Sequence, residues 1–556
     1  MQPGGIDFPV LSQQIRHDQQ KQQQTSQLDP VMCGARARPF ADVGIPQKLL
    51  DANRNLSFYW DSFRSDGGCE LRIQACAPAS TMAPGKGAIT APHLPLPDHV
   101  RHFALVFLLG LLSLKLGFAQ EGNQSSPKNA GCHVEAVDYK GWQAQQLSNR
   151  WVQLIVVPQN GGRLMQVTFA GHPYLFVNPK LAGKYFPPSS SQWFNYGGDK
   201  LWLLPEGNND EHHWPGSSDL IDDGQFSFRK ISEGQQCEIE LTGPADPQTG
   251  IQFQRTIRLG GDSPLIRFHA SLKNVAGHVV EWSMQSVSQY ETSDPAAPSG
   301  FNHDFWTFTP ANPSSGYLNR YHVRFGPAEN PAVSVREDGL FTVHYVHMAA
   351  ELWLDSTDGW LAVVDGSSKY AMVERFQYEE SKKYPGKASV IFWTNGPELR
   401  LNNDGTASLT KDSDAGPYYL EAELNSPTYR LRPGEACDFE TEWFPTRAGD
   451  EFHGATDAGI LIHPLRAIRL GNGKIKVSGS FGVFFSGRLV AHFYNEHGAS
   501  IGTMPLVDVN PTEVVSLETE ILPPAKPARL SLHLEDENGL DRGALQELQI
   551  AMGDNR

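Results

Sequence analysis

An all-β fold is predicted for this chain, because short apolar segments recur along it with no helix-length amphipathic pattern between them. The segments are rich in β-branched and aromatic residues and are separated by Gly, Pro, Asn and Asp. Predicted strands in the first group span 151–157, 163–169, 225–231, 236–241, 252–259, 265–272 and 279–289. A second group spans 341–346, 359–364, 371–376, 389–394 and 438–444. These strands are more than one small sandwich can hold.

A second, smaller β-sandwich is predicted after the large one. Alternating stretches at the C-terminal end fit an immunoglobulin-like module over 453–556, and they span 474–477, 489–494, 514–519 and 529–535. The segment 446–452 is the expected link. A length of 556 residues also predicts two or three domains rather than one.

The N-terminal part of the sequence has the composition of a disordered or spurious extension over 1–100, with a Gln-rich run between Gln13 and Gln27. It is followed by a secretory signal peptide at 101–119, with an apolar run at 103–114 and the small residues Gly117 and Ala119 before the cleavage site. That run is shorter than the roughly 20 residues that span a bilayer. Translation is therefore expected to start later, at Met82, and the mature chain to be secreted or periplasmic without a membrane span.

The charge of the chain limits its possible ligands, and its cysteine content limits its possible disulfides. The formal net charge of −16 argues against nucleic acid and favours a neutral or cationic ligand. Outside the extension lie Cys132, Cys237 and Cys437, which allow one disulfide at most and leave its pairing open. The sequence assigns no metal and no cofactor, and it leaves the oligomeric state unknown.

The stretch from Tyr418 to Glu435 carries the clearest functional pattern. In a strand, residues i and i+2 share a face, so Glu421 and Glu423 are expected on one face with Tyr419, and Leu420 and Leu424 on the other. Two carboxylates among aromatic side chains point to sugar chemistry. The plainer alternative is an antiparallel strand with a solvated face, on which exposed Glu needs no function.

Three segments resemble the galactose mutarotase-like (aldose 1-epimerase-like) superfamily, and within it an uncharacterised branch of secreted bacterial proteins. The segments are Asn160-Gly161-Gly162-Arg163-Leu164, Asn195 to Trp202, and Leu420-Glu421 with Leu431-Arg432-Pro433-Gly434-Glu435. The resemblance covers roughly 145–445. It implies a large β-supersandwich over 120–445 with a sugar pocket.

The resemblance implies that Glu421 is the general base that opens a sugar ring. The two family histidines fall at Tyr196 and near Gln285, so the usual acid is missing: a phenol has a reference pKa of about 10 and an amide does not titrate. The residues expected to contact substrate are Arg163, Asn195, Asp199, Lys200, Trp202, Gln285 and Glu423.

The loop from Asp210 to Trp214 offers a candidate for the missing acid. His213 there can supply acid–base chemistry or join nearby carboxylates at a metal, although adjacent histidines match no known ligand spacing and a solvated polar loop is the alternative. Two hypotheses follow. The first is a secreted carbohydrate-binding protein with a mutarotase-like pocket, whose partner is a sugar or glycan. The second is an epimerase-like or lyase-like enzyme in which Glu421 is the base and Tyr196, Lys200 or His213 the acid.

Overall fold

The computed structural model describes residues 131–188, 193–207, 213–214, 220–401, 407–409 and 416–552. It confirms the all-β prediction: among these residues the only α-helix is α3 (Leu220–Asp223), and nearly all strand pairs are antiparallel. The predicted extension and signal peptide lie outside the described residues. Within them, no helix has the length and apolar character needed to cross a membrane.

One large sheet holds twelve strands. Its order is β1-β2-β3-β4-β6-β11-β22-β19-β16-β13, with β5 paired to β4 and β23 paired to β11. The strands are β1 (His133–Tyr139), β2 (Trp142–Ser148), β3 (Val152–Val157), β4 (Arg163–Phe169), β5 (His172–Pro173), β6 (Asp199–Leu204), β11 (Val280–Glu291), β13 (His322–Phe325), β16 (Ala350–Leu354), β19 (Val390–Thr394), β22 (Tyr419–Asn425) and β23 (Tyr429–Leu431).

A second large sheet holds ten strands in the order β14-β15-β12-β17-β18-β24-β10-β9-β8-β7. They are β7 (Ser227–Ser232), β8 (Gln236–Thr242), β9 (Ile251–Gly260), β10 (Ile266–Asn274), β12 (Phe305–Pro310), β14 (Val333–Val335), β15 (Leu340–His344), β17 (Trp360–Asp365), β18 (Tyr370–Phe376) and β24 (Ala436–Arg447). A separate pair joins β20 (Leu399–Leu401) to β21 (Ala407–Leu409), and a 3₁₀ turn spans Pro385–Lys387.

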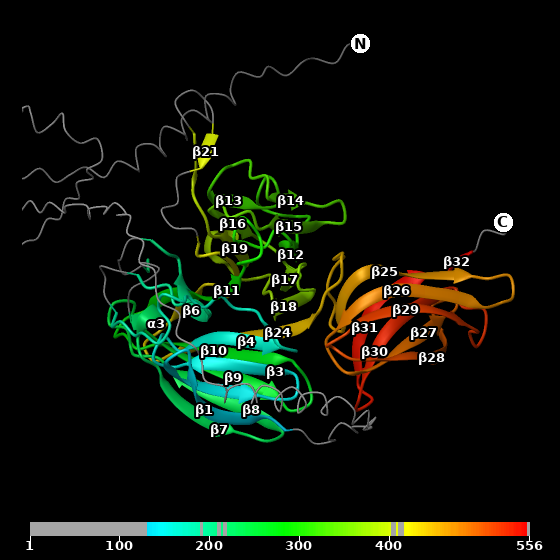
Figure 1. Ribbon diagram of the computed structural model, residues 1–556, viewed down its shortest axis with the longest axis horizontal. Helices are drawn as coiled ribbons and strands as arrows, with labels where there is room; N and C mark the ends of the chain where they lie inside the picture. The colour runs from blue at the N-terminus through cyan, green and yellow to red at the C-terminus, as the bar shows by residue number, and fades with distance from the viewer. Residues whose placement is uncertain are drawn as a thin grey trace, which may run out of the picture. The chain divides into compact units, whose positions relative to one another are not determined.

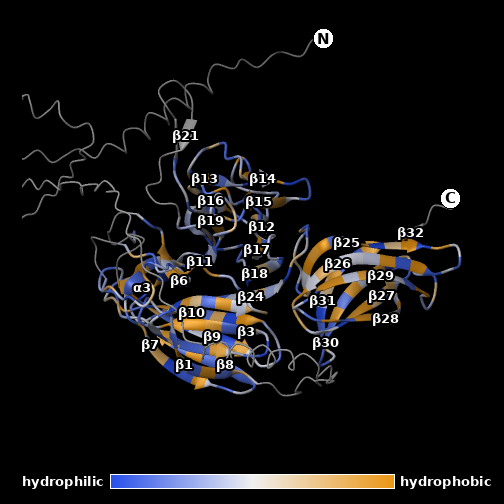
Figure 2. Ribbon diagram, viewed as in Figure 1, coloured by the Kyte–Doolittle hydropathy of each residue, from blue (hydrophilic) through white to orange (hydrophobic). Residues whose placement is uncertain are grey.

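The C-terminal strands form two four-stranded sheets, β29-β26-β25-β32 and β28-β27-β30-β31. They are β25 (Gly459–Arg469), β26 (Ile475–Val483), β27 (Gly487–Tyr494), β28 (Ser500–Val509), β29 (Val514–Ile521), β30 (Arg529–Asp536), β31 (Asp541–Gln549) and β32 (Ala551–Met552). Apolar and polar residues alternate along these strands (Figure 2), as expected for sheets with one buried face.

The two large sheets pack face to face around one core. In Figure 1, β3 and β4 lie beside β9 and β10, and Leu154 and Leu164 share a buried cluster with Ile257 and Phe268. The sequence pattern located most of these strands to within a few residues. The strands that it missed include β1, which Glu135 and Asp138 interrupt, β2, which Gln residues interrupt, and β6, which follows directly on a Gly-Gly turn; β12, β13 and β16 were also missed.

A buried polar network crosses this core. Asp199 on β6 forms an ion pair with Arg255 on β9 and accepts hydrogen bonds from Ser286 and Ser288. Elsewhere between the sheets, the Tyr290 hydroxyl donates to Glu374 Oε1 at 2.5 Å. Burial raises the pKa of Glu374 to about 8, so this carboxyl is largely protonated at neutral pH.

Glu374→Gln should therefore flatten the pH dependence of stability. Because the folded-state pKa lies above the unfolded value of 4.5, the stabilising effect of Glu374 is complete below pH 4.5 and is lost as the pH rises through about 8. Between pH 5 and 8 this group should lower the unfolding free energy of the parent by on the order of 1 kcal/mol per pH unit. Urea denaturation at several pH values measures the difference, and parallel profiles for parent and variant would contradict it.

A disulfide joins the start of the large domain to β8. Cys132 and Cys237 are bonded with their Cα atoms 5.7 Å apart, and Cys437 on β24 is a buried free thiol. The bridge closes a loop with a sequence separation of 105 residues and so removes many conformations from the unfolded chain. This settles the pairing that the sequence had left open.

Replacing both Cys132 and Cys237 by Ser should lower the unfolding free energy by roughly 2–5 kcal/mol. The measurement is urea denaturation, accompanied by peptide mapping of the unreduced parent. Cys437→Ala is the matched control, because it should keep the linked peptide pair. Alkylation of Cys132 in the unreduced, denatured parent would show that the bridge is absent.

Candidate functional site

Strand β22 is the centre of the candidate site. It lies between β11 and β19, with Glu421 opposite Gln289 and Trp393. Leu420, Ala422 and Leu424 enter the core between the large sheets. The predicted alternation is thus confirmed, and the two glutamates occupy the opposite face of the sheet.

The same face continues across five neighbouring strands. Pairing sets Lys200 and Trp202 of β6 beside β11, and Glu351 and Trp353 of β16 beside β19. We call this surface the glutamate face and define it as Lys200, Trp202, Gln285, Gln289, Glu351, Trp353, Trp393, Glu421 and Glu423. It contains the expected base, Glu421, and four of the residues expected to contact substrate.

Both central glutamates are nearly buried, and both are held by side chains of β11. Gln289 Nε2 donates to Glu421 Oε1 at 2.5 Å, and Lys200 Nζ lies 3.7 Å from the same oxygen. The Gln285 amide donates to Glu423 Oε2. Glu421 therefore has a cationic partner, whereas Glu423 has a neutral one.

The ionisable groups of this face shift one another's pKa values. Burial, with Glu421 next in importance, raises the pKa of Glu423 well above its ordinary value. Burial also lowers the pKa of Lys200, while Glu421 opposes that change. Burial raises the pKa of Glu351. The face is thus rich in carboxyl groups that cannot all be ionised together, which is the usual condition of an acid–base site.

Glu206, directly after β6, belongs to the same electrostatic group. Glu206 is exposed to solvent, yet the surrounding protein desolvates its carboxyl, and Glu351 and Glu421 add like charge. Together they raise the pKa of Glu206 to about 7. No sequence pattern singled out Glu206, because the strand before it was itself not predicted.

Aromatic rings line the rest of the face. Trp353 Nε1 donates to Glu351 Oε1 at 2.6 Å, and the Trp393 ring lies 5.7 Å from that of Phe325. On the other side, Lys200 Nζ lies 4.0 Å from the centre of the Trp202 ring. Both Trp353 and Trp393 are partly accessible to solvent. The carboxylates are therefore flanked by indole rings on both sides.

Arg163 supports this face from behind. It is fully buried, and its Nη2 lies 2.6 Å from Asp222 Oδ1, the same oxygen that accepts the Trp202 indole N–H at 2.8 Å. Gly161, with φ +67°, permits this approach, because a Cβ there would lie 1.9 Å from the Asp222 carbonyl oxygen. Arg163, expected to contact substrate, instead positions Trp202 through Asp222.

The remaining expected residues are placed elsewhere. Asp199 is fully buried on the core side with Arg255, because adjacent residues of β6 point to opposite faces. Tyr196 packs against Trp142, its hydroxyl accepts the Phe186 N–H, and burial raises its pKa to about 12. Such a phenol does not donate a proton readily at neutral pH.

Two further expected residues lie in the segments around β6. Asn195 Oδ1 accepts the Gly197 N–H, so this side chain holds the turn before β6. His213 is exposed near Gly207. The rest of its loop, 208–212 and 215–219, lies outside the described residues.

A concavity of about 550 Å³ occupies another part of the same sheet. Its lining comes from the first five strands and the segment after them, and it includes Tyr139, Gln146, Gln153 and Thr168. Glu291, two residues beyond Gln289 on β11, also lines it. No residue of the glutamate face lines it, so it is a separate feature.

One cluster with metal-ligand chemistry occurs among the described residues: His492, His533 and Asp541 in the C-terminal sheets. Sequence inspection did not single it out, because 41 residues separate its two histidines and no short spacing motif connects them.

Comparison with known proteins finds distant structural neighbours. No family model matches the sequence, and no curated protein matches it. Similar solved structures are galactose mutarotase-like proteins. One, from Clostridium acetobutylicum, has 10% identity and a TM-score of 0.37, over 58% of this chain and 100% of that one. A galactose mutarotase related enzyme from Lactobacillus acidophilus has 11% identity and a TM-score of 0.35, over 56% and 99%.

A TPR-domain containing protein from Parabacteroides distasonis is also similar, with 14% identity and a TM-score of 0.37. That match spans 59% of this chain and 54% of the other, or about half the length of that protein. At these TM-scores the likeness is too distant to place site residues or to assign an activity.

Glu421→Gln and Glu423→Gln should differ in stability at pH 7. The first leaves the buried Lys200 without its acidic partner and should cost roughly 3–5 kcal/mol. The second replaces a carboxyl whose pKa burial raises well above its ordinary value by a neutral isostere, and should cost less than about 1 kcal/mol. Urea denaturation of both variants provides the test. Equal losses in the two variants would contradict this prediction.

Proposed function

We propose that this chain is a secreted or periplasmic carbohydrate-binding protein, and that it binds a neutral sugar through the glutamate face. One observation carries the proposal: the carboxyl groups of β22 and β16 share one face of the sheet with the indole rings of β6, β19 and β16, with Trp202 at one side and Trp353 at the other. Indole rings stack on the C–H faces of sugars, and carboxylates accept hydrogen bonds from their hydroxyls. The C-terminal sandwich would then be a spacer or a second contact.

Charge supports a neutral ligand. The face and its border carry the carboxyls of Glu206, Glu351, Glu421 and Glu423, against the ammonium of Lys200 and the guanidinium of Arg324, which acts on Glu206 and Glu351. An acidic sugar would meet like charge there, and the chain as a whole has a net charge of −16. Uronic acids and sulfated glycans should therefore bind more weakly than neutral sugars.

Thermal-shift and calorimetric screening of the full chain against neutral and acidic oligosaccharides tests the proposal. A neutral sugar bound only by the folded state should raise the melting temperature. Trp353→Ala should weaken its binding at least about tenfold, because it removes a stacking surface. Trp306→Ala, on the other large sheet, is the matched control and should leave the affinity unchanged. If both variants bound the sugar with equal affinity, the binding site would not be the glutamate face.

A second candidate function is acid–base catalysis on the bound sugar, of the epimerase-like or lyase-like kind. It is favoured by the pair of Glu421, which is held beside Lys200, and Glu206, whose pKa of about 7 suits a general acid at neutral pH. Glu421 would take a proton and Glu206 would supply one. This assignment replaces the acids considered from the sequence.

If catalysis occurs, Glu206→Gln should abolish conversion of the bound sugar while retaining its affinity within a few-fold. NMR detection of the anomeric and ring protons of the sugar reports epimerisation or elimination directly. Glu238→Gln, on the other large sheet, is the matched control. Binding without conversion by the parent would leave the protein a carbohydrate-binding protein only.

A further inference from the structure

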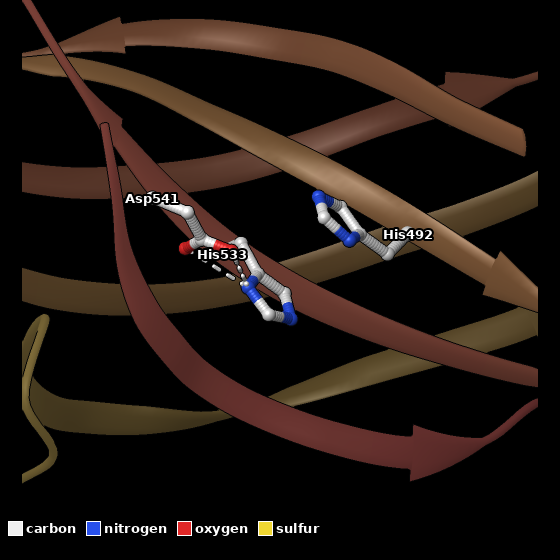
Figure 3. A group of neighbouring side chains, drawn as sticks. All are labelled: His492, His533 and Asp541. Atoms are coloured by element: carbon white, nitrogen blue, oxygen red, sulfur yellow. Dashed lines mark hydrogen bonds and ion pairs between the residues drawn. The ribbon is translucent and has the colours of Figure 1, made fainter. Parts of the chain in front are cut away.

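Three adjacent strands of the C-terminal sheet bring two histidines and one aspartate together. His492 of β27 pairs with Ser531 of β30, so His533, two residues further along β30, shares the same face. The two imidazole rings stack with centroids 4.1 Å apart and planes at 7°. Asp541, at the start of β31, accepts from His533 Nδ1 at 2.9 Å (Figure 3).

We propose that His492, His533 and Asp541 bind a divalent transition-metal ion. Two imidazole nitrogens and one carboxylate oxygen form a donor set that suits Zn²⁺, Ni²⁺ or Cu²⁺, whereas Ca²⁺ and Mg²⁺ take oxygen ligands. The inference concerns the C-terminal sheets alone and does not depend on the glutamate face.

The three candidate ligands lie near one another, and their side chains would have to rotate to bind one ion. One ligand atom from each residue can be chosen so that all three lie within 4.8 Å of one another. With metal–ligand bonds of about 2.1 Å, the ligand atoms of a tetrahedral site lie about 3.4 Å apart. Rotation about the side-chain torsions closes the difference. Such rotation is open to these side chains, because both histidines are partly accessible and Asp541 is exposed.

The surrounding charges favour a cation. Glu535, on the same strand as His533, adds a second carboxylate that acts on His492. The nearby guanidinium groups are engaged elsewhere, that of Arg529 with Glu547 and that of Arg542 with Asp536. Repulsion from these two cations is therefore offset by their own partners.

The number of ligands suggests what the ion would do. Structural zinc sites usually have four protein ligands, and sites with three keep a position for water or an external ligand. This cluster offers three protein ligands at the surface of the sheet. A bound ion would therefore have a free position for an oxygen or nitrogen donor from outside the chain.

The test is titration of the full chain, freed of metal with a chelator, with ZnCl₂ and NiCl₂ by isothermal calorimetry. The parent should show one saturable site more than His492→Gln and Asp541→Asn, or an affinity at least roughly tenfold higher. His497→Gln is the matched control, because its exposed ring contacts only Glu496 among the described ion pairs. That variant should bind as the parent does.

Electron paramagnetic resonance of the Cu²⁺-loaded protein provides a readout that folding defects do not imitate. The parent should show hyperfine splitting from two imidazole nitrogens, and His492→Gln should show one. Circular dichroism confirms that each variant is folded. Titrations that are the same for parent and His492→Gln, or a copper spectrum without nitrogen splitting, would overturn the proposal and leave an ordinary His533–Asp541 ion pair.

Discussion

The two-residue alternation of strand β22 is the constraint on which the candidate site depends. Leu420, Ala422 and Leu424 fill the core between the two large sheets, so Glu421 and Glu423 must occupy the other face. A shift of register by one residue would bury both carboxylates among aliphatic side chains and expose the leucines. The energy that fixes the core therefore also fixes the orientation of the charged face.

The charged groups of the site differ in how well their charges are balanced by neighbouring residues. Glu421 has Lys200 and Gln289, and Arg163 lies behind Trp202 on Asp222, so the positive charges are fixed before any ligand arrives. Burial raises the pKa values of Glu423 and Glu351, although Lys200 opposes the change at Glu423 and Arg324 opposes it at Glu351. Because an ionised carboxylate accepts hydrogen bonds and a protonated carboxyl donates one, the glutamates of this face can offer both acceptors and donors. A sugar hydroxyl, which is donor and acceptor at once, matches this mixture better than a purely anionic or apolar ligand does.

The sequence predicted the parts of this arrangement that depend on local pattern. Alternation placed Glu421 and Glu423 on one face, and most strands were located from their composition. It did not predict that β16 and β19 bring Glu351 and Trp393 beside them, because the register between distant strands is set by tertiary packing and not by a local period. Asp199 shows the same limit within one strand: it was expected beside Lys200, but neighbours on β6 face opposite ways, and Asp199 meets Arg255 in the core.

The histidine cluster of the C-terminal sheets shows why a search for sequence motifs can overlook a site. A metal motif is recognised when its ligands follow one another on a turn or a helix, but here each ligand comes from a different strand, and only the order β27-β30-β31 joins them. Each histidine, taken alone, is an ordinary polar residue on a sheet of alternating pattern. Two imidazoles stacked face to face are unfavourable when both are charged; Asp541 contacts His533 directly and, with Glu535, also acts on His492. A metal ion bound by all three residues would hold both rings in the neutral form, so the two rings would no longer repel each other.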